Sequence, residues 1–459
     1  MDTDIRILEV ETDFIDYKAR QMLVFGRGFA EKDRAAGWTA FRARVKVENK
    51  KGETADGYGL MFLAVTWAYP SDVLADAERL QAMKEVALRY ADLIRNYKGY
   101  GHPVDIHFQT RPALKDIKKE VCQELGLTEE MPLLGALVSA SPFDSCLHDG
   151  FGKANNISSY AGLGKEFMES DLSTYLGPKY KGKYIADFIR PDFSPRIPIF
   201  HLVGGGDKLT SAEIDDSDPK DGLPVSLDQW IGRDGLYCFK VKLKGQDLGW
   251  DVDRIVSVTR VIEETLKGEG REEFYTSADA NELCPDPEYV LEMLAKVKEK
   301  SPLAYDRLLY LEQPTERELS AHRYDMRQIA RLKPVVADEG VVDLETLELA
   351  QELGWSGVGL KVCKGFSSAL VYVAKCESDG LIYTVQDLTN PGVALLWSVG
   401  FAARIRTLMG VEYNSRQYFP LASERERKIH RPLFEVKRGE VSTETLTGPG
   451  LGFRVEEMG

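Results

Sequence analysis

Three carboxylates, Asp279, Glu312 and Asp338, each end a short apolar segment of the chain. Apolar runs of this length are typical of strands buried on both faces. In a β/α barrel the C-terminal ends of adjacent strands converge, so we expect these three side chains within a few ångströms of one another. Carboxylate oxygens without His or Cys partners favour Mg²⁺ over Zn²⁺, and the spacing therefore predicts a magnesium site.

The alternative for each acid is simple solvation at the end of a strand. A single acid at a barrel mouth is usually solvated, but three acids on successive strands favour a shared cation.

Lysines flank these acids along the chain. Lys240 and Lys242 end the strand before Asp279, and Lys361 ends the strand after Asp338. Alternation along a strand places Lys240 and Lys242 on one face. If that face points inward, like charge and burial lower a lysine pKa toward the range of a base. The alternative is a solvated face, which Lys244 would continue.

The elements that must position these residues are repeated strand and helix patterns. Candidate strands span residues 197–203, 237–243, 274–279, 308–312, 334–338, 357–362, 381–386 and 410–413. Helical patterns, including one over residues 316–332, separate them. Eight such units predict an α/β fold, and a β/α barrel more than an open doubly wound sheet.

The N-terminal part of the chain differs in kind. Residues 5–10, 39–47 and 54–67 alternate as antiparallel strands, and residues 71–97 carry a helical apolar stripe. We therefore expect an α+β capping domain over 1–140, a barrel over 141–415, and a C-terminal segment, 416–459, that returns to the cap. Residues 21–38 form a long expected loop, either functional or a plain surface loop, and residues 207–229 form an insertion.

Composition and charge argue against some classes of partner and indicate a location. The 459 residues carry a net charge of −14, which argues against nucleic acid and anionic membranes as partners. The N-terminus shows no secretory signal, and the apolar runs are too short to span a bilayer. Six scattered cysteines without CxxC spacing are typical of a reducing compartment, so we expect a cytoplasmic location.

The order of the motifs resembles the enolase superfamily. The matching segments are Phe239-Lys240-Val241-Lys242, Asp279-Ala280-Asn281-Glu282, Leu311-Glu312-Gln313-Pro314, Ala337-Asp338-Glu339 and residues 360–365. Lysines on both the second and the sixth strand resemble the muconate-lactonizing-enzyme group of the mandelate-racemase-like family. The resemblance extends to residues 143–153 and 449–452, and so covers about residues 140–459. The preceding part of the chain resembles the family's cap only in plan.

This resemblance implies a modified TIM barrel, (β/α)7β, with an α+β capping domain. It implies that Asp279, Glu312 and Asp338 bind Mg²⁺. Lys242 and Lys361 would be acid/base residues on opposite faces of the substrate, with Lys240 completing the catalytic set. Mg²⁺ chelates a carboxylate, so the charge left when the α-proton departs develops on oxygens that face the metal, giving a stabilised enediolate.

Further residues are assigned to substrate binding. Asn281 would support the metal site or the substrate. The mandelate-racemase pattern has a His at the seventh strand end, where this chain has Asp387, which argues against acid-sugar dehydration. Asp387 and Glu412 would polarise the substrate carboxylate, and His201, in the first barrel strand, would touch substrate; the alternative for each is a structural role.

The simplest reaction for two opposed lysines is racemisation or epimerisation of a small-molecule carboxylate. Cycloisomerisation or β-elimination is the alternative if the substrate carries a leaving group. A non-catalytic binding barrel is a third hypothesis, disfavoured because such a protein needs neither the acids nor both lysines together. We also expect a homo-oligomer.

Overall fold

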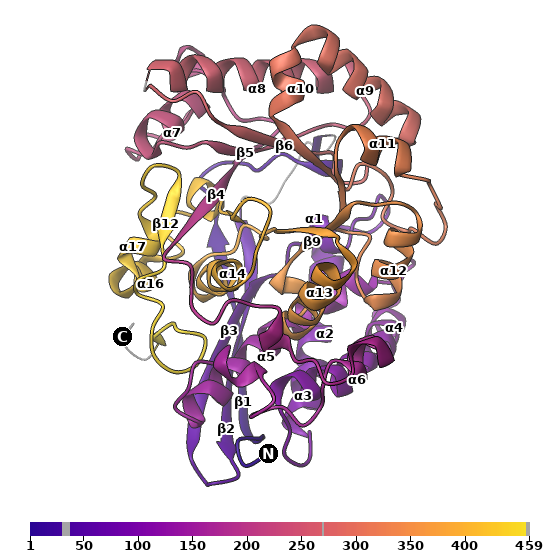
Figure 1. Ribbon diagram of the computed structural model, residues 1–459, viewed down its shortest axis with the longest axis vertical. Helices are drawn as coiled ribbons and strands as arrows, with labels where there is room; N and C mark the ends of the chain where they lie inside the picture. Colours follow the sequence, from indigo (N-terminus) through magenta and orange to yellow (C-terminus); the bar gives the residue numbers. More distant parts are fainter. Residues whose placement is uncertain (30–36, 269, 456–459) are drawn as a thin grey trace.

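The structure is a computed structural model that describes residues 1–29, 37–268 and 270–455. Of the expected loop over residues 21–38, positions 30–36 lie outside the described residues. The cap occupies the lower part of Figure 1 and the barrel the upper part, with the C-terminal helices along one side. No helix among the described residues is long and apolar enough to cross a membrane. The six cysteines are buried and free.

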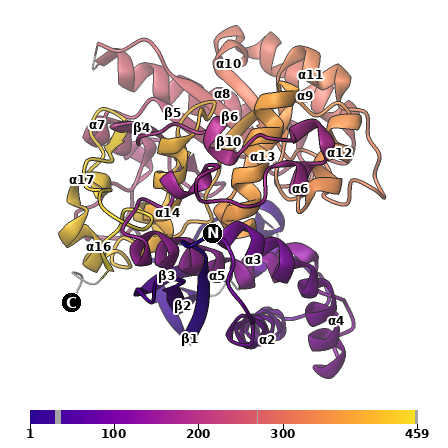
Figure 2. The ribbon, with the colours of Figure 1, turned by 60° about the horizontal axis from the view of Figure 1, so that its bottom comes forward.

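An antiparallel sheet forms the base of the cap. Its strands are β1 (Ile5–Lys18), β2 (Gly37–Asn49) and β3 (Thr54–Phe62), in that order. The helices that follow this sheet include α1 (Val65–Ala68), α2 (Asp76–Arg95), α3 (Pro103–Thr110), α4 (Leu114–Glu124) and α5 (Leu133–Ala154). Helix α5 lies between this sheet and the barrel (Figure 2).

Two glycines of β3 allow α5 to lie directly on the strand. A Cβ at Gly57 would come within 1.8 Å of the Cys146 carbonyl oxygen, and one at Gly59 within 2.1 Å of the Pro142 carbonyl oxygen. Any side chain there would separate helix from sheet.

The predicted strand over residues 54–67 is too long. It ends at Phe62, whose N–H donates to Asn390 Oδ1 of the barrel at 3.1 Å. The chain then turns into α1, which brings Trp67 toward the barrel. The predicted helix over residues 71–97 is α2, shorter by a few residues at each end.

The barrel is closed. In the described part of the chain it contains eight parallel strands: β4 (Arg196–Val203), β5 (Cys238–Lys242), β6 (Tyr275–Asp279), β7 (Leu308–Glu312), β8 (Val335–Ala337), β9 (Gly357–Leu360), β10 (Ile382–Val385) and β11 (Val411–Glu412). Strand β11 pairs with β4 through Val411 and Ile199, which closes the ring.

Helices cover the outside of the ring. They are α7 (Leu227–Asp234), α8 (Leu248–Gly268), α9 (Pro287–Lys300), α10 (Pro302–Arg307), α11 (Arg327–Leu332), α12 (Leu344–Glu352), α13 (Phe366–Asp379) and α14 (Gly392–Arg404). Each strand from β4 to β10 is followed by at least one helix before the next strand begins. The predicted modified TIM barrel, (β/α)7β with an α+β cap, is therefore confirmed.

The predicted helix over residues 316–332 is wrong for most of its length. Only α11 is helical, and residues 316–326 form an irregular loop with a turn at 319–321. In this loop Arg317 turns inward, donating to both oxygens of Glu282 at 2.5 and 2.8 Å. A buried guanidinium with these contacts fixes the loop in place of a helical turn.

The remaining helices and strand lie before β4 or after β11. They are α6 (Ser173–Leu176), α15 (Ser415–Tyr418), α16 (Glu424–Ile429), α17 (Arg431–Phe434) and β12 (Glu440–Ser442), which pairs antiparallel with β4. Ser159 N–H donates to the Gly450 carbonyl at 2.8 Å, and Leu451 N–H to Asp149 Oδ1 of α5 at 3.1 Å. The predicted boundary between residues 140 and 141 falls inside α5, so the division into domains stays a prediction.

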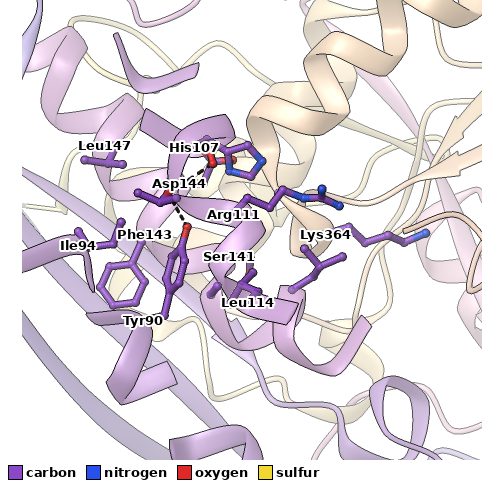
Figure 3. Close-up of a pocket in the computed structure, with 14 residues that line it drawn as sticks. Tyr90, Ile94, His107, Arg111, Leu114, Ser141, Phe143, Asp144, Leu147 and Lys364 are labelled. Carbon is purple, nitrogen blue, oxygen red and sulfur yellow. Dashed lines mark hydrogen bonds and ion pairs between the residues drawn. The ribbon is translucent and has the colours of Figure 1, made fainter. Parts of the chain in front are cut away.

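A buried polar cluster joins the cap to the helix α13 that follows β9. Asp144 of α5 accepts hydrogen bonds from the N–H and the hydroxyl of Ser367, both at 2.7 Å, at the first turn of α13. His107 of α3 lies beside Asp144 in Figure 3, with Nδ1 3.1 Å from Oδ2, and its Nε2 is 2.8 Å from the Ser368 hydroxyl. His148 Nε2 lies 2.9 Å from the Ser367 hydroxyl.

Burial keeps these histidines neutral. It lowers the pKa of His107 and of His148 to about 3, and that of His102, on the same side of the cap, to about 4. Burial also raises the pKa of Asp144. In the unfolded chain these histidines titrate near their ordinary pKa of about 6.5. Between these pH values the unfolded state binds more protons, so stability falls as the pH falls below about 6.5.

We expect the substitution His107→Gln to make unfolding less dependent on acid. Each buried histidine costs about 1.4 kcal/mol of stability per pH unit between its two pKa values, and the variant lacks one of them. Urea unfolding at pH 7 and pH 5 measures the difference. His322→Gln, at an exposed position, is the control and should leave the pH dependence unchanged. Equal loss of stability on acidification in wild type and His107→Gln would contradict this account.

Candidate active site

The C-terminal ends of the barrel strands bring the predicted residues together. Lys242 pairs across the sheet with Asp279, and Asp279 with Glu312. Asp338 directly follows β8, and Lys361 directly follows β9. All five side chains are buried. Because paired residues of parallel strands point the same way, Lys242, Asp279 and Glu312 line one continuous face of the barrel.

The two candidate acid/base lysines stand on opposite sides of the barrel mouth. Strands β5 and β9 lie four places apart in the ring of eight that the described residues form. The three strands that carry the acids, β6, β7 and β8, fill the arc between them. Lys242 and Lys361 therefore flank the carboxylates from either end, and both line the same cavity.

Lys240 occupies the centre of the carboxylates. Its Nζ lies 2.8 Å from Glu312 Oε1, 3.0 Å from Asp279 Oδ2 and 3.3 Å from Glu412 Oε2, and the side chain is 1% exposed. The amide oxygen of Gln386 also accepts from Nζ at 3.1 Å. A fully buried ammonium is tolerated only with such a set of anionic partners.

Each of the other lysines is held by its own acid. Lys242 Nζ donates to Asp279 Oδ2 at 2.5 Å and to Asn281 Oδ1 at 2.9 Å. Lys361 Nζ lies 2.6 Å from Asp338 Oδ2. Lys364, in the turn after Lys361, lies 3.0 Å from Asp338 Oδ1 and donates to the Asp338 carbonyl at 2.6 Å.

The expectation that crowding between Lys240 and Lys242 lowers the lysine pKa is wrong for Lys240. Burial lowers the pKa of Lys240, but Glu312, Glu412 and Asp279 outweigh burial, so its pKa lies well above the usual value. For Lys361 burial is likewise outweighed, chiefly by Asp338, and the pKa is raised. Carboxylates lie between the ammonium groups and reverse the effect of like charge.

Burial and the neighbouring charges shift the pKa values of the three acids in different directions. Burial raises the pKa of Asp279, but the charges of Lys242 and Lys240 have the larger, opposite effect, so its pKa lies below the usual value. For Asp338, Lys361 and Lys364 outweigh burial in the same way. Burial raises the pKa of Glu312, and Asp279 and Asp338 add to burial, so its pKa lies well above the usual value.

The acids lie near one another but are separated by ammonium groups. Asp279 and Glu312 pair in register, and Lys240 Nζ contacts both of them. Within residues 1–29, 37–268 and 270–455, no three acidic, histidine or cysteine side chains are grouped closely enough to hold a metal ion. The magnesium site expected at Asp279, Glu312 and Asp338 stays a prediction.

The donor set nevertheless fits a divalent cation in charge and chemistry. The buried carboxylates of the described site are Asp279, Glu312, Asp338, Glu339, Asp387 and Glu412, and the buried ammonium groups are Lys240, Lys242, Lys361 and Lys364. With all ten groups ionised, this leaves an excess of two negative charges. Among the described residues, Glu312 Oε2 also has no hydrogen-bond partner although it is buried. An unsatisfied, anionic set of oxygen donors suits Mg²⁺.

Asn281, Asp387 and Glu412 also belong to the site. Asn281 adopts a left-handed conformation with φ of 45° and accepts from Lys242. Asp387 N–H donates to Glu412 Oε2 at 3.0 Å, and both side chains line the cavity. Burial, then the charge of Glu412, raises the pKa of Asp387 to about 6.

His201 lies elsewhere. It pairs in register with Phe239, whereas its neighbour Leu202 pairs with Lys240 and lines the cavity. The His201 ring packs against Trp230 of α7, with ring centroids 5.4 Å apart, on the outer side of the barrel wall. The expected contact of His201 with substrate is therefore wrong in this structure, because strand alternation turns the imidazole outward.

Some site residues were not predicted from the sequence. Lys364 follows Lys361 by three residues, and that spacing within one turn was the available signal. Gln386 precedes Asp387, and its NH₂ donates to the Tyr310 hydroxyl at 2.9 Å. Trp67 comes from the cap, and no pattern in the sequence connects it with the barrel.

The cavity is small and is covered by the cap. It is lined by Leu23, Phe25, Trp38, Ala64, Trp67, Leu202, Lys240, Lys242, Lys361, Asp387, Leu388, Thr389, Glu412 and Asn414. Its volume of about 30 Å³ is room for roughly two water molecules. Binding of a larger molecule therefore requires the covering residues to move.

Two hydrogen-bonded contacts lie at the edges of the two long segments, residues 21–38 and 207–229, beside this cavity. Arg20 donates to Asp221 of the insertion at 2.5 and 2.9 Å, and Gly205 N–H donates to the Val24 carbonyl at 2.8 Å. Leu23 and Phe25 lie beside these two anchors and line the cavity. The described part of the expected loop is therefore part of the site.

The family model described as Enolase C-terminal domain-like matches residues 225–458. A comparison with curated protein sequences finds no match.

The solved structures that share the fold include the following three. The L-Ala-D/L-Glu epimerase from Bacillus subtilis has a TM-score of 0.61 and 15% identity, covering 98% of each chain. The dipeptide epimerase from Enterococcus faecalis V583, complexed with Mg and the dipeptide L-Leu-L-Tyr, has a TM-score of 0.59 and 16% identity, covering 97% of this chain and 99% of that one. The muconate lactonizing enzyme from Pseudomonas fluorescens, complexed with muconolactone, has a TM-score of 0.59 and 15% identity, covering 99% and 98%.

We expect Lys240→Met to destabilise the protein strongly at neutral pH. The substitution leaves Asp279, Glu312 and Glu412 buried without their shared cation, and removing one partner of a buried ion pair costs about 3–5 kcal/mol. Chemical unfolding at pH 7 and pH 4.5 measures this, and the loss should shrink at the lower pH as the carboxylates protonate. Lys244→Met, on the same segment but partly exposed, is the matched control. A Lys240→Met protein as stable as the control at pH 7 would refute the charge balance described above.

Proposed function

The chain belongs to the enolase superfamily, in its mandelate racemase and muconate lactonizing enzyme family, and from this premise we propose a reaction for it. The protein removes the proton α to a carboxylate of a small molecule and returns a proton to the same carbon. With a lysine on each side of that carbon, the outcome is racemisation or epimerisation. The observation that carries this proposal is the placement of Lys242 and Lys361 on opposite strands around one cavity.

Asp279, Glu312 and Asp338 are the residues proposed to hold Mg²⁺. They stand on three successive strands, and the surrounding site carries an excess of two negative charges. The dipeptide epimerase of the same fold was solved with Mg. When bound, the cation supplies a positive charge that stabilises negative charge developing on the substrate carboxylate.

Lys242 and Lys361 carry the protons in this proposal. Asp338 raises the pKa of Lys361 in the structure, and the positive charge of a cation bound at Asp338 would oppose this effect. In the proposed reaction, the lysine that is then a neutral amine removes the α-proton from its own face, and the other, as an ammonium, delivers a proton to the opposite face. The same two groups exchange roles for the other configuration. Asn281 holds Lys242 through its amide oxygen, and Asp338 holds Lys361, so both Nζ atoms are positioned before substrate binds.

The remaining side of the barrel orients the carboxylate. Lys240 lies between the acids and Glu412, where its ammonium complements a substrate carboxylate without reaching either face of the α-carbon. Asp387 and Glu412 lie across the mouth from the proposed metal ligands and are proposed to bind polar groups of the substrate. These assignments follow from position in the ring of strands.

The neighbouring cavity indicates the remainder of the substrate. A space of about 550 Å³ lies beside the site and shares Leu23, Phe25, Trp38, Ala64 and Trp67 with it. Its lining is mostly apolar, and ligand sites in proteins have volumes of this order. We therefore propose a carboxylate that carries an apolar group, which would occupy this space once the wall formed by Leu23 and Phe25 opens.

We expect Glu312→Gln to lose Mg²⁺ binding. The amide removes one negative charge and one strong oxygen donor from the proposed set. Isothermal titration of the protein with MgCl₂ measures the affinity, and Asp279→Asn and Asp338→Asn should give the same result. Glu440→Gln, on β12 away from the mouth, is the control. Wild-type affinity in all three site variants would place the cation elsewhere.

The two lysines should act on opposite configurations. We expect Lys242→Ala and Lys361→Ala each to abolish racemisation, because one face loses its acid/base group, at a cost of about 10²–10⁴-fold. Each variant should still exchange the α-proton of one enantiomer with D₂O, and the two variants should prefer opposite enantiomers. Proton NMR of each pure enantiomer, from a library of carboxylates with apolar side chains, measures the exchange.

Two other outcomes of that experiment have defined meanings. Exchange of the same enantiomer by both variants would replace the two-base reaction with β-elimination or cycloisomerisation, in which one lysine removes the proton and the other acts only through its charge. No exchange by the wild-type protein on any carboxylate, with Mg²⁺ bound, would overturn the proposed function itself.

A further inference from the structure

Trp67 of the cap contacts two of the loops that follow the acid-bearing strands, and also the lysine that follows β9. Its ring centroid lies 4.0 Å from Lys361 Nζ. Its indole N–H donates to Glu339 Oε1 at 2.7 Å, and its carbonyl accepts from Arg317 at 3.0 Å. Arg317 in turn is bound to Glu282 by two hydrogen bonds. The Trp67 side chain is 4% exposed and lines the active-site cavity.

The same indole is connected to the opposite lysine. Glu339 Oε1 accepts a second hydrogen bond, from the Asn281 NH₂ at 2.9 Å. The oxygen of that amide accepts from Lys242 Nζ at 2.9 Å. The orientation of Asn281 is therefore fixed at both ends, by Glu339 on one side and Lys242 on the other. One residue of the cap reaches Lys361 through its ring and Lys242 through its N–H.

We infer that Trp67 is a positioning residue that sets both acid/base lysines. The inference rests on the proposed function for the roles of Lys242 and Lys361, and it assigns to the cap a part in the chemistry that the barrel residues do not perform. An aromatic face within about 6 Å attracts an ammonium and restricts where it lies. A charge-assisted hydrogen bond to Glu339 does the same for the carboxylate that holds Asn281.

Two parts of the indole have separate effects under this inference. The ring acts on Lys361, and the N–H acts on Lys242 by way of Glu339 and Asn281. Replacement of Trp67 by benzothienylalanine keeps the ring and its shape but removes the N–H. Trp67→Leu removes both. Trp250→Leu, on α8 outside the site, is the control.

The first measurement is exchange of the α-proton from each enantiomer in D₂O. With benzothienylalanine we expect exchange on the face served by Lys242 to fall about tenfold or more, since a hydrogen bond to a charged group is lost. Exchange on the face served by Lys361 should stay close to wild type. Trp67→Leu should reduce exchange on both faces by about 10²-fold, the effect of a small misplacement of a reacting group. Trp250→Leu should change neither.

The second measurement does not depend on catalysis. The rates at which Lys242 and Lys361 are acetylated by acetic anhydride, followed by mass spectrometry of peptides, report how firmly each Nζ is held. Benzothienylalanine should speed the reaction of Lys242 alone, and Trp67→Leu should speed that of both lysines. If wild type shows no proton exchange, the proposed function fails while this measurement still decides the positioning role. The inference would be overturned if benzothienylalanine changed the acetylation rates of Lys242 and Lys361 equally, or if Trp67→Leu changed neither rate.

Discussion

Buried charge at the C-terminal end of the barrel is the constraint on which the rest of the structure depends. Six carboxylates and four ammonium groups lie in a region that water hardly reaches, and each lysine is held by acids at 2.5–3.3 Å. Such charges are tolerated only as an ordered set, because any one left alone costs several kcal/mol. The order comes from the parallel strands, which place Lys242, Asp279 and Glu312 in register. The two uncompensated negative charges then make the site receptive to a divalent cation.

The cap covers the charged groups and also contacts the elements that hold them. Glycines at positions 57 and 59 allow α5 to lie on the cap sheet, and Asp144 of α5 binds the first turn of α13, the helix that follows Lys361. Trp67, on a short helix after the cap sheet, touches the charged groups directly. Arg20 is bound to Asp221 of the insertion, and the Val24 carbonyl accepts from Gly205, just after β4. These contacts connect the position of the cap to the position of both lysines and also leave the cavity nearly closed.

Much of the barrel could be predicted from the sequence, because strands buried on both faces are continuous apolar runs that end in charge. All eight strands and the acids that follow them were found in this way.

Three errors have physical causes. The helix expected over residues 316–332 is mostly absent because Arg317 turns inward to Glu282. His201 faces outward because strand alternation, invisible without the register, decides its side. The pKa of Lys240 rises, not falls, because carboxylates from three other strands surround its ammonium group, which a linear pattern does not reveal. Trp67 was missed because its partner Glu339 lies 272 positions further along the chain. The oligomeric state stays a prediction.

The account depends on one arrangement, a cation held by three acids with a lysine on each side of the substrate carbon. A crystal structure of the wild-type protein grown with MgCl₂ and a carboxylate that undergoes α-proton exchange tests it most directly. The account predicts one Mg²⁺ bound by Asp279, Glu312 and Asp338, with Lys242 Nζ and Lys361 Nζ within hydrogen-bond reach of opposite faces of the α-carbon. A cation bound elsewhere, or both ammonium groups on one face of the ligand, would contradict it.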